Sequence, residues 1–386
     1  MRKLIYLVSF LLAVVAALPA YVESSFLQTL VGTKSVGSIF AISSLLTIAT
    51  FSFLPTQLKN WGLRRPLIIF SFFAIVATVQ LAVSPSGYAT LLAFVVFYSA
   101  GMIIRYLLDV LLEQYSDDRS TGSTRGLYMT AYNLAWLCSP FLVGRILEIY
   151  PERYSLIFFL TLPAMLLALI ITIVALKEKD RKEFRLSSPL QAIKKLWRSS
   201  NKNDADVKKI LAIDFLLHFF YAIMVVYSPI YLHEVIGLTW SQIGIIFTFM
   251  LLPFVLFELP LGRLADKYLG EKELLIASII LSAIATASIP LVSGQSLIVW
   301  GLILFLTRTG AAGIEIMKET YLFKKIDSQN ADIIAVSRNN VPLAYLIGPL
   351  FATVFLAFLP LKFIFLAVAL ATLSSLFFAN SLRDTR

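Results

Sequence analysis

Long apolar runs separated by short polar segments are the dominant pattern along this chain of 386 residues. Each run has close to the roughly 20 residues that an α-helix needs to cross the hydrocarbon core of a bilayer. The pattern therefore predicts an all-α integral membrane protein with twelve transmembrane helices. We expect these helices at residues 4–29, 36–57, 65–83, 88–111, 122–146, 154–176, 209–232, 240–261, 273–292, 295–317, 332–357 and 360–381.

The first apolar run has a second interpretation. Arg2, Lys3, the apolar stretch after them and the ending Ala17-Leu-Pro-Ala20 are also typical of a secretory signal peptide. However, the pattern Phe26-Leu-x-x-x-Val-Gly32 returns 205 residues later as Tyr231-Leu-x-x-x-Ile-Gly237. The first run thus has a counterpart in the seventh, and we expect it to be retained as a helix.

The same echo continues along the chain. Trp61-Gly62-Leu63-Arg64 corresponds to Leu269-Gly270-Glu271-Lys272, and Ser139-Pro140 corresponds to Gly348-Pro349. An offset that stays nearly constant indicates two homologous halves of six helices each. We expect an N-terminal half at 1–176, a cytoplasmic linker at 177–208 and a C-terminal half at 209–386.

The composition agrees with a membrane protein. The mean hydropathy is +0.83, 59% of the residues are hydrophobic and 15% are charged, whereas about 25% are charged in a typical soluble protein. The net charge of +10 could indicate a nucleic-acid partner, but half of it lies in residues 177–208, which carry ten Lys and Arg against five Asp and Glu. A basic loop of this kind orients a membrane protein with that loop in the cytoplasm.

The distribution of Lys and Arg predicts the topology. With the N-terminus inside, the loops that hold most of the basic residues are all cytoplasmic. These loops are 58–65, 112–121, 177–208, 262–272 and 318–331. We therefore expect a multi-pass protein of the cell membrane, either plasma membrane or bacterial inner membrane, with both termini in the cytoplasm. In the linker, Ser188-Pro189 followed by Leu190, Ile193, Leu196 and Trp197 on one face predicts a short amphipathic helix on the inner leaflet.

Few enzyme classes fit this sequence. Cys138 is the only cysteine, and His218 and His233 are the only histidines, so zinc sites of the usual ligand spacing are excluded. The chain has no H-E-x-x-H, no G-x-S-x-G and no phosphate-binding G-x-x-x-x-G-K-[ST] motif. We expect no cofactor and no enzymatic activity. A membrane enzyme stays as the alternative from another class, and it would need a polar catalytic cluster at one membrane face.

Charged residues inside the apolar runs are the candidates for a functional site, because a charge at a helix centre costs about 2.5–3.5 kcal/mol on insertion scales. Arg308 lies closest to the middle of its run, and Glu315 follows seven residues later on nearly the same face. In the seventh run, Asp214, His218 and Tyr221 form one polar stripe at i, i+4 and i+7 spacing. We expect these residues to bind the substrate or the coupling ion.

Other polar positions have competing explanations. Arg105 and Asp109 are one turn apart in the fourth run, where a structural ion pair is as good an explanation as substrate contact. Glu23 lies near the outer end of the first run, where it lines an external vestibule or is solvated at the interface. His218 could be a buried structural histidine, and Lys318 with Glu319 is expected to be solvated at a helix end.

The polar segment from Glu258 to Lys272 carries the clearest family signal. The order of Gly262, Asp266, Lys267, Gly270 and Lys272 resembles the loop motif of the major facilitator superfamily. Gly262 would let two helices approach closely, and Gly270 would adopt a positive φ in a turn. Asp266 is expected to bind the N-terminus of the fifth helix and to pair there with Arg125 when the cytoplasmic side is closed.

The first half departs from the family pattern. Leu54 and Leu58 stand where the motif has its glycine and aspartate, which leaves the first-half gating contact without its acid. The fourth run also lacks the family's R-x-x-Q-G signature after Arg105. This second departure argues against the proton-coupled drug antiporters.

The resemblance implies a secondary transporter that binds a small solute between its two halves and alternates access to the two sides of the membrane. The energy would come from an ion gradient, with protons as the expected coupling ion and Asp214, His218 and Glu315 as the candidate carriers. Expected partners are the small-molecule substrate, protons and membrane lipids, with no nucleic acid, and the protein is expected to be a monomer. A lipid or lysolipid translocase of the same fold is the alternative within this class.

Overall fold

The computed structural model describes residues 2–83, 86–114, 121–176, 202–265, 270–325 and 331–383, together with Leu196 and Arg198. Within these residues every regular element is helical. Asp266 and Lys267 of the loop motif lie outside the described residues, as does the amphipathic helix expected in the linker apart from Leu196. The same holds for the side chains of Asp109 and Arg125.

The chain divides into two compact units, which are described separately. Unit 1 contains Met1–Arg185 with Thr239–Ile245, and unit 2 contains Leu186–Leu238 with Ile246–Arg386.

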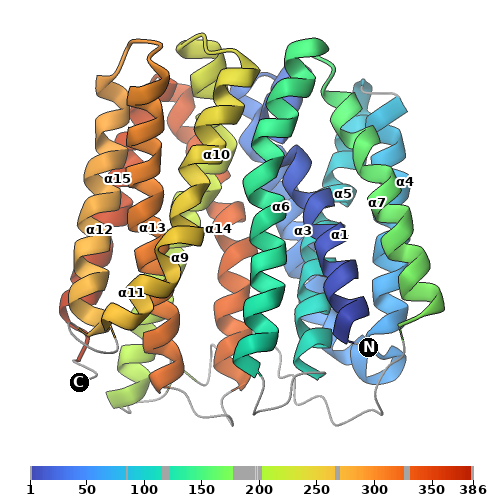
Figure 1. Ribbon diagram of the computed structural model, residues 1–386, viewed down its shortest axis with the longest axis horizontal. Helices are drawn as coiled ribbons and strands as arrows, with labels where there is room; N and C mark the ends of the chain where they lie inside the picture. The colour runs from blue at the N-terminus through green and yellow to red at the C-terminus, as the bar shows by residue number, and fades with distance from the viewer. Residues whose placement is uncertain are drawn as a thin grey trace. The chain divides into compact units, whose positions relative to one another are not determined.

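Unit 1 is a bundle of long helices in which α1 contacts α5, α6 and α7, α4 contacts α5 and α7, and α3 contacts α2 and α5 (Figure 1). Its helices are α1 (Arg2–Ala20), α2 (Glu23–Val31), α3 (Thr33–Trp61), α4 (Arg64–Val83), α5 (Gly87–Gln114), α6 (Thr121–Ile149) and α7 (Tyr154–Val174).

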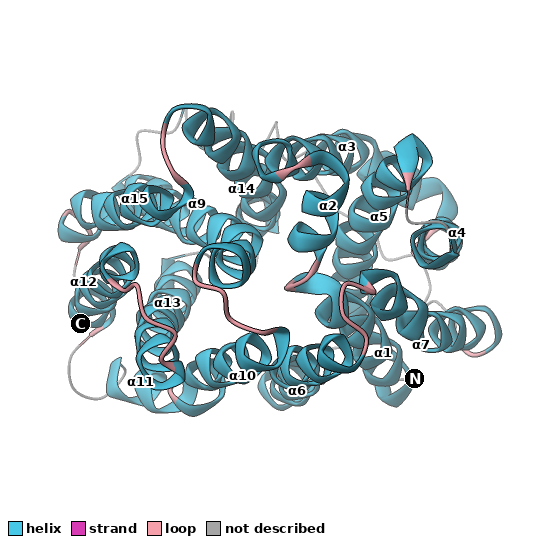
Figure 2. Ribbon diagram, turned by 90° about the horizontal axis from the view of Figure 1, so that it is seen from above, coloured by secondary structure: helices cyan, strands magenta, loops and turns pink. Residues whose placement is uncertain are grey.

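Unit 2 is organised around its first helix, α9 (Lys202–Ile230), which packs against α13, α14 and α15 (Figure 2). A single π-helical turn, η1 (Tyr231–Val235), continues α9. The other elements are α10 (Trp240–Leu256), α11 (Glu258–Leu264), α12 (Glu271–Ser288), η3 (Ile289–Leu291), α13 (Leu297–Lys325), α14 (Ala331–Phe358), η4 (Leu361–Phe363) and α15 (Ile364–Asn380). The start of α10, from Trp240 to Ile245, belongs to unit 1.

The helices confirm the all-α membrane fold class. Ten described helices are long and apolar enough to cross a membrane, or eleven if the bent pair α1 and α2 is one span. In addition, α6 covers the fifth expected span, 122–146. Each of the twelve predicted runs therefore coincides with one helix or with two consecutive helical elements, such as α1 and α2 or α10 and α11.

The first span is broken, whereas the sequence pattern predicted one continuous helix over 4–29. The α1 helix ends at Ala20, and α2 starts at Glu23 with its axis bent by 46°. Pro19 explains the break, because proline has no N–H to donate and its ring clashes with the preceding turn. The Val22 N–H instead donates to the Pro19 carbonyl oxygen at 2.8 Å, which closes a tight turn.

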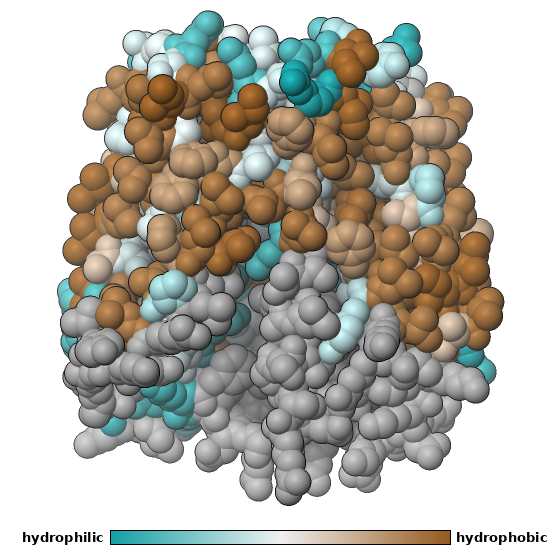
Figure 3. Space-filling view, viewed as in Figure 1, coloured by the Kyte–Doolittle hydropathy of each residue, from teal (hydrophilic) through white to brown (hydrophobic). Residues whose placement is uncertain are grey.

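The outer surface of the helices suits a lipid environment. Val174, Ile298 and Phe377 each expose about three-quarters of their area (77%, 74% and 78%). On the face in Figure 3, apolar side chains cover most of the described surface, and hydrophilic ones gather along its upper edge. Buried hydroxyls bond to their own helix, as Thr47 does to the Ser43 carbonyl at 2.9 Å and Thr78 to the Ala74 carbonyl at 2.7 Å. This pairing satisfies polar groups where no water is present.

The predicted repeat has matching backbone conformations at corresponding positions. Gly32 and its counterpart Gly237 have φ of 72° and 79°, and Gly62 and its counterpart Gly270 have φ of 73° and 82°. Gly32 and Gly62 directly follow helices and Gly270 directly precedes one, and all four glycines have a positive φ at which residues with a Cβ are strained. The positive φ expected for Gly270 is therefore present.

The close approach of two helices that was expected at Gly262 is not seen in the described part of unit 2, where a Cβ at Gly262 would meet no atom within 4 Å. The close approach occurs instead at Gly310 on α13. A Cβ there would lie 2.5 Å from the Ser282 backbone nitrogen and 2.6 Å from the Ser278 carbonyl oxygen of α12. Small residues on both helices allow this packing of α12 against α13.

Candidate functional site

A buried ion pair joins α9 to α13 in the interior of unit 2. Asp214 and Lys318 expose 2% and 6% of their area, and Lys318 Nζ contacts Asp214 Oδ1. The other carboxylate oxygen, Oδ2, accepts hydrogen bonds from Asn340 Nδ2 at 2.8 Å and from Ser337 Oγ at 3.0 Å, both on α14. Asp214 therefore connects three helices.

His218 lies one turn after Asp214 on the same helix. Its Nδ1 is 2.8 Å from the Asp214 carbonyl oxygen and 3.3 Å from Asp214 Oδ1. Together with Lys318, Ser337 and Asn340, it surrounds Asp214 with donors, which favours the ionised carboxylate. A buried carboxylate with this many partners acts as a fixed negative charge for Lys318.

Lys318 was expected to be solvated at a helix end, and this expectation is wrong. The α13 helix continues to Lys325, two turns beyond Lys318, and this extension keeps Lys318 inside the bundle. Ser337 and Asn340 were not anticipated either. Only the i+3 spacing of Lys318 from Glu315 could have indicated that it shares the polar face of α13.

Tyr221, the third member of the polar stripe on α9, contacts both charged residues predicted on α13. Its hydroxyl donates a hydrogen bond of 2.8 Å to Glu315 Oε2. The guanidinium carbon of Arg308 lies 5.1 Å from the centre of the Tyr221 ring and 5.4 Å from the centre of the Phe220 ring. The structure thus brings Tyr221, Arg308 and Glu315 together, next to the Asp214 ion pair on the same two helices.

The remaining residues predicted to bind the substrate or the coupling ion lie in unit 1. Glu23 is the first residue of α2 and is only 6% exposed, so solvation at the membrane interface does not describe it. Arg105 is exposed on α5.

The described part of the loop motif borders a second charged cluster. Lys272 Nζ donates to the Leu382 carbonyl oxygen at 3.0 Å, and the fully buried Glu271 pairs with Lys324. Asp206 at the start of α9 is also buried and lies 3.3 Å from Lys209 Nζ. Lys272 and Lys209, whose Nζ contacts the Ser381 carbonyl oxygen, attach the C-terminal segment to the N-terminal parts of α12 and α9.

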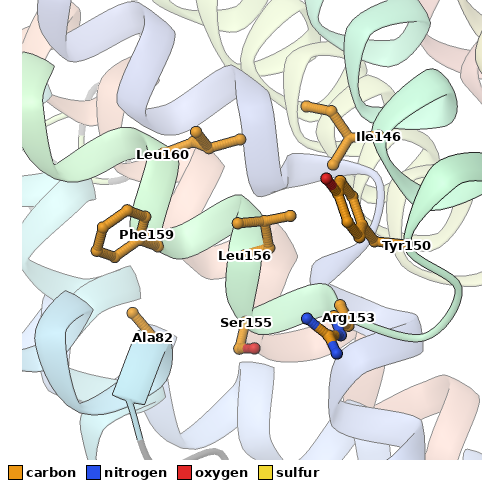
Figure 4. Close-up of a pocket in the computed structure, with 8 residues that line it drawn as sticks. All are labelled: Ala82, Ile146, Tyr150, Arg153, Ser155, Leu156, Phe159 and Leu160. Carbon is orange, nitrogen blue, oxygen red and sulfur yellow. The ribbon is translucent and has the colours of Figure 1, made fainter.

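Unit 1 contains a cavity of about 530 Å³ that none of the predicted site residues line. Figure 4 shows its mostly apolar wall, with the Arg153 guanidinium and the Tyr150 hydroxyl as its main polar groups. The lining residues come from the ends of α4 and α6, the connection between α6 and α7, and the start of α7. They are Ala82, Ile146, Tyr150, Arg153, Ser155, Leu156, Phe159 and Leu160.

In the described part of the chain, no group of three or more His, Cys, Asp or Glu side chains could hold a metal ion. The buried polar cluster of unit 2 offers a guanidinium that has no carboxylate partner among the described residues, a carboxylate bonded to a tyrosine, and a neutralised ion pair. Such groups can bind a charged solute or exchange a proton.

The comparisons with known proteins agree with these observations. The family model for the Major Facilitator Superfamily matches residues 4–320. A solved structure described as a POT family transporter in complex with 5-aminolevulinic acid is similar at a TM-score of 0.78 and 13% sequence identity, covering 100% of this chain and 96% of that chain. At this identity the likeness concerns the fold. No curated protein matches the sequence.

Proposed function

Because the chain belongs to the major facilitator superfamily of transporters, we propose that it is a secondary transporter that couples the movement of a small solute to protons. The observation that carries this proposal is the buried polar cluster on α9 and α13, where Tyr221 contacts both Arg308 and Glu315. Charged side chains are costly inside a membrane protein and mark substrate or ion pathways. Alternating access of a site between the two halves is the mechanism that this fold uses.

Glu315 is the best candidate for the proton carrier. Asp214 must keep its charge to balance the buried Lys318, and the imidazole of His218 is engaged with Asp214. Within the described residues, the hydrogen bond from Tyr221 is the one that Glu315 accepts. Glu315 can therefore gain or lose a proton without breaking an ion pair, which neither Asp214 nor Lys318 can do.

A lipid or lysolipid translocase of the same fold would be expected to have few central charges. The cluster of unit 2 has four, at Asp214, Arg308, Glu315 and Lys318, of which Asp214, Arg308 and Lys318 are buried. This charge density favours a polar solute over a lipid chain. We propose that the transporter resides in the cell membrane with both termini in the cytoplasm.

Reconstituted transport tests the proposal. The purified protein would be placed in liposomes that contain a pH-sensitive dye, and solutes would be added outside. 5-Aminolevulinic acid is a reasonable first probe, because the similar solved structure contains it; sugars, amino acids, drugs and lysolipids follow. We expect at least one solute to enter together with protons.

The variant Glu315→Gln should abolish proton movement, while Glu319→Gln, one turn later on the exposed side of α13, should preserve it. A protonophore would also be added at a fixed solute gradient. If the rate of solute uptake stays the same with and without the protonophore, proton coupling is ruled out. Wild-type proton movement in a well-expressed Glu315→Gln variant would remove Glu315 from the role of carrier.

A further inference from the structure

Arg308 is a buried cation whose charge is not paired within the described residues. It exposes 2% of its area, and its Nε is buried without a hydrogen-bond partner there. Its contacts are the faces of two aromatic rings, Phe220 and Tyr221, at 5.4 and 5.1 Å from the guanidinium carbon. The rings attract the cation but accept none of its five N–H donors in the way that an oxygen does.

The acidic groups near Arg308 have other partners. Glu315 accepts the hydroxyl of Tyr221, and Asp214 is paired with Lys318 and bonded to Ser337 and Asn340. The ion pair of Asp214 and Lys318 shows how a buried cation is neutralised elsewhere on the same two helices. Arg308 lacks such a neutralising carboxylate among the described residues, although it lies at the same polar face of α13.

A guanidinium packed against aromatic faces keeps a rigid fork of donors for a planar anionic acceptor. Its N–H groups match the two oxygens of a carboxylate or of a phosphoryl group, and such charge-assisted bonds are stronger than those between neutral groups. Arg308 and its two aromatic neighbours therefore supply the hydrogen-bond donors and the positive charge of an anion-binding site, and a ligand would supply the acceptor oxygens.

We infer that Arg308 binds an anionic oxygen group of the transported solute, so that the substrates are small organic anions such as carboxylates or phosphate monoesters. This inference rests on the proposed transport function and specifies its substrate class. Phe220 and Tyr221 position the guanidinium, and Tyr221 also joins this position to Glu315. A neutral solute would leave the guanidinium without an acceptor and is disfavoured for that reason.

Matched pairs of probes test the charge requirement. The full-length protein in nanodiscs of neutral phosphatidylcholine would be titrated with glutarate against glutaramide, and with glycerol 3-phosphate against glycerol. Binding would be followed by calorimetry and by the shift of the thermal unfolding midpoint. We expect at least one anion to bind and its uncharged counterpart to fail. Stabilisation by neither anion at millimolar concentration, or equal binding of the uncharged counterpart, overturns the inference.

Two substitutions separate recognition from folding. Arg308→Gln should weaken anion binding by about tenfold or more, and Arg308→Lys should weaken it less, because lysine keeps the charge but loses the planar fork. Arg145→Gln removes an exposed arginine of unit 1 and should leave the affinity unchanged. If Arg308→Gln fails to fold, Arg308→Lys still decides the question, because wild-type affinity in that variant contradicts binding through the fork.

Two further arms identify the anion and separate the inference from the transport function. The same measurements would be repeated in nanodiscs that contain phosphatidylglycerol. If this lipid stabilises the protein through Arg308 and soluble anions do not compete with it, the site binds a lipid headgroup, and the assignment to a solute is overturned. Transport of a neutral or cationic solute that persists in Arg308→Gln would overturn the substrate class and leave the transporter function intact. Anion binding through Arg308 without transport of any solute would support the anion site and contradict the transporter function.

Discussion

Asp214 on α9 and Lys318 on α13 form a buried ion pair although 104 residues separate them in the sequence. The pair connects α9, the first helix of unit 2, to α13, and Asn340 and Ser337 extend the contact to α14. Since both side chains are buried, neither charge can be removed alone without leaving the other one uncompensated.

Breaking this ion pair on one side should therefore destabilise the protein strongly. We expect Asp214→Asn to lower the free energy of unfolding by about 3–5 kcal/mol, because Lys318 stays buried and charged. The double variant Asp214→Asn with Lys318→Met should recover most of this loss, because it removes both charges and keeps an acceptor for Asn340. Unfolding in mixed detergent, followed by tryptophan fluorescence, measures both values.

The control is Glu148→Gln, which removes one partner of the exposed pair between Arg145 and Glu148 and should leave stability unchanged. An Asp214→Asn protein as stable as the wild type would contradict the role of the pair. A double variant that is less stable than the single variant would contradict its explanation.

Tyr221 has two separable interactions, and a pair of substitutions measures each of them. Tyr221→Phe keeps the ring beside Arg308 but loses the hydrogen bond to Glu315, which should cost about 1–3 kcal/mol of stability. Tyr221→Leu loses the aromatic face as well and should cost about a further 0.5–2 kcal/mol. Equal stability of the two variants would show that the ring face does not stabilise Arg308. Phe219→Leu on the same helix, which removes a ring that contacts Phe351, provides the comparison for a general packing effect.

The fold was largely predictable because it depends on local properties of the sequence. A run of apolar residues long enough to cross a bilayer forms a helix wherever it occurs, and all twelve runs coincide with helices. The break in the first span was also present in the sequence as Pro19. It was missed because hydropathy averages over a window and does not register one missing N–H.

The site was only partly predictable, because its side chains contact partners on other helices. Helical spacing placed Asp214, His218 and Tyr221 on one face, and Arg308 and Glu315 on another. Spacing cannot show which helix faces which. Lys318 was therefore assigned to solvent, although its carboxylate partner lies on α9. The close approach of α12 and α13 at Gly310 was not predicted for the same reason, since close packing depends on the neighbouring helix and not on the residue alone.

The packing of α12 against α13 gives a prediction that separates two glycines. Gly310→Ala places a methyl group against backbone atoms of Ser278 and Ser282, which cannot move aside as a flexible side chain would. We expect a loss of about 1–3 kcal/mol in the free energy of unfolding. Gly262→Ala, which meets open space, should be neutral or slightly stabilising because alanine favours the helix. A larger loss at Gly262 than at Gly310 would reverse this interpretation.

The topology can be tested with single cysteines in a Cys138→Ser background, which removes the exposed native thiol. The excess of Lys and Arg between residues 177 and 208 predicts that this loop is cytoplasmic. An impermeant maleimide added to intact cells should therefore label Ser86→Cys, which lies between α4 and α5, and should not label Ser200→Cys. After permeabilisation both should react. Labelling of Ser200→Cys from outside intact cells would invert the proposed orientation.

The C-terminal segment should depend on side chains from three helices. The Tyr321 hydroxyl of α13 donates to the Arg383 carbonyl oxygen at 2.9 Å, and Lys272 of α12 donates to the neighbouring Leu382 carbonyl at 3.0 Å. Lys209 of α9 contacts the Ser381 carbonyl. These bonds hold the chain directly after α15, where the regular helical hydrogen bonds end.

Removing two of these donors should loosen the segment without unfolding the unit. We expect Tyr321→Phe combined with Lys272→Met to increase the hydrogen-exchange rate of the amides of Ser381 and Leu382, which now donate to the Phe378 and Ala379 carbonyls. Exchange in the middle of α15 should stay slow. Lys362→Met at the start of that helix is the control, because Lys362 contacts only the Phe363 ring among the described residues. If the exchange rates of Ser381 and Leu382 do not change in the double variant, the backbone hydrogen bonds to Phe378 and Ala379 are sufficient to hold this segment in place.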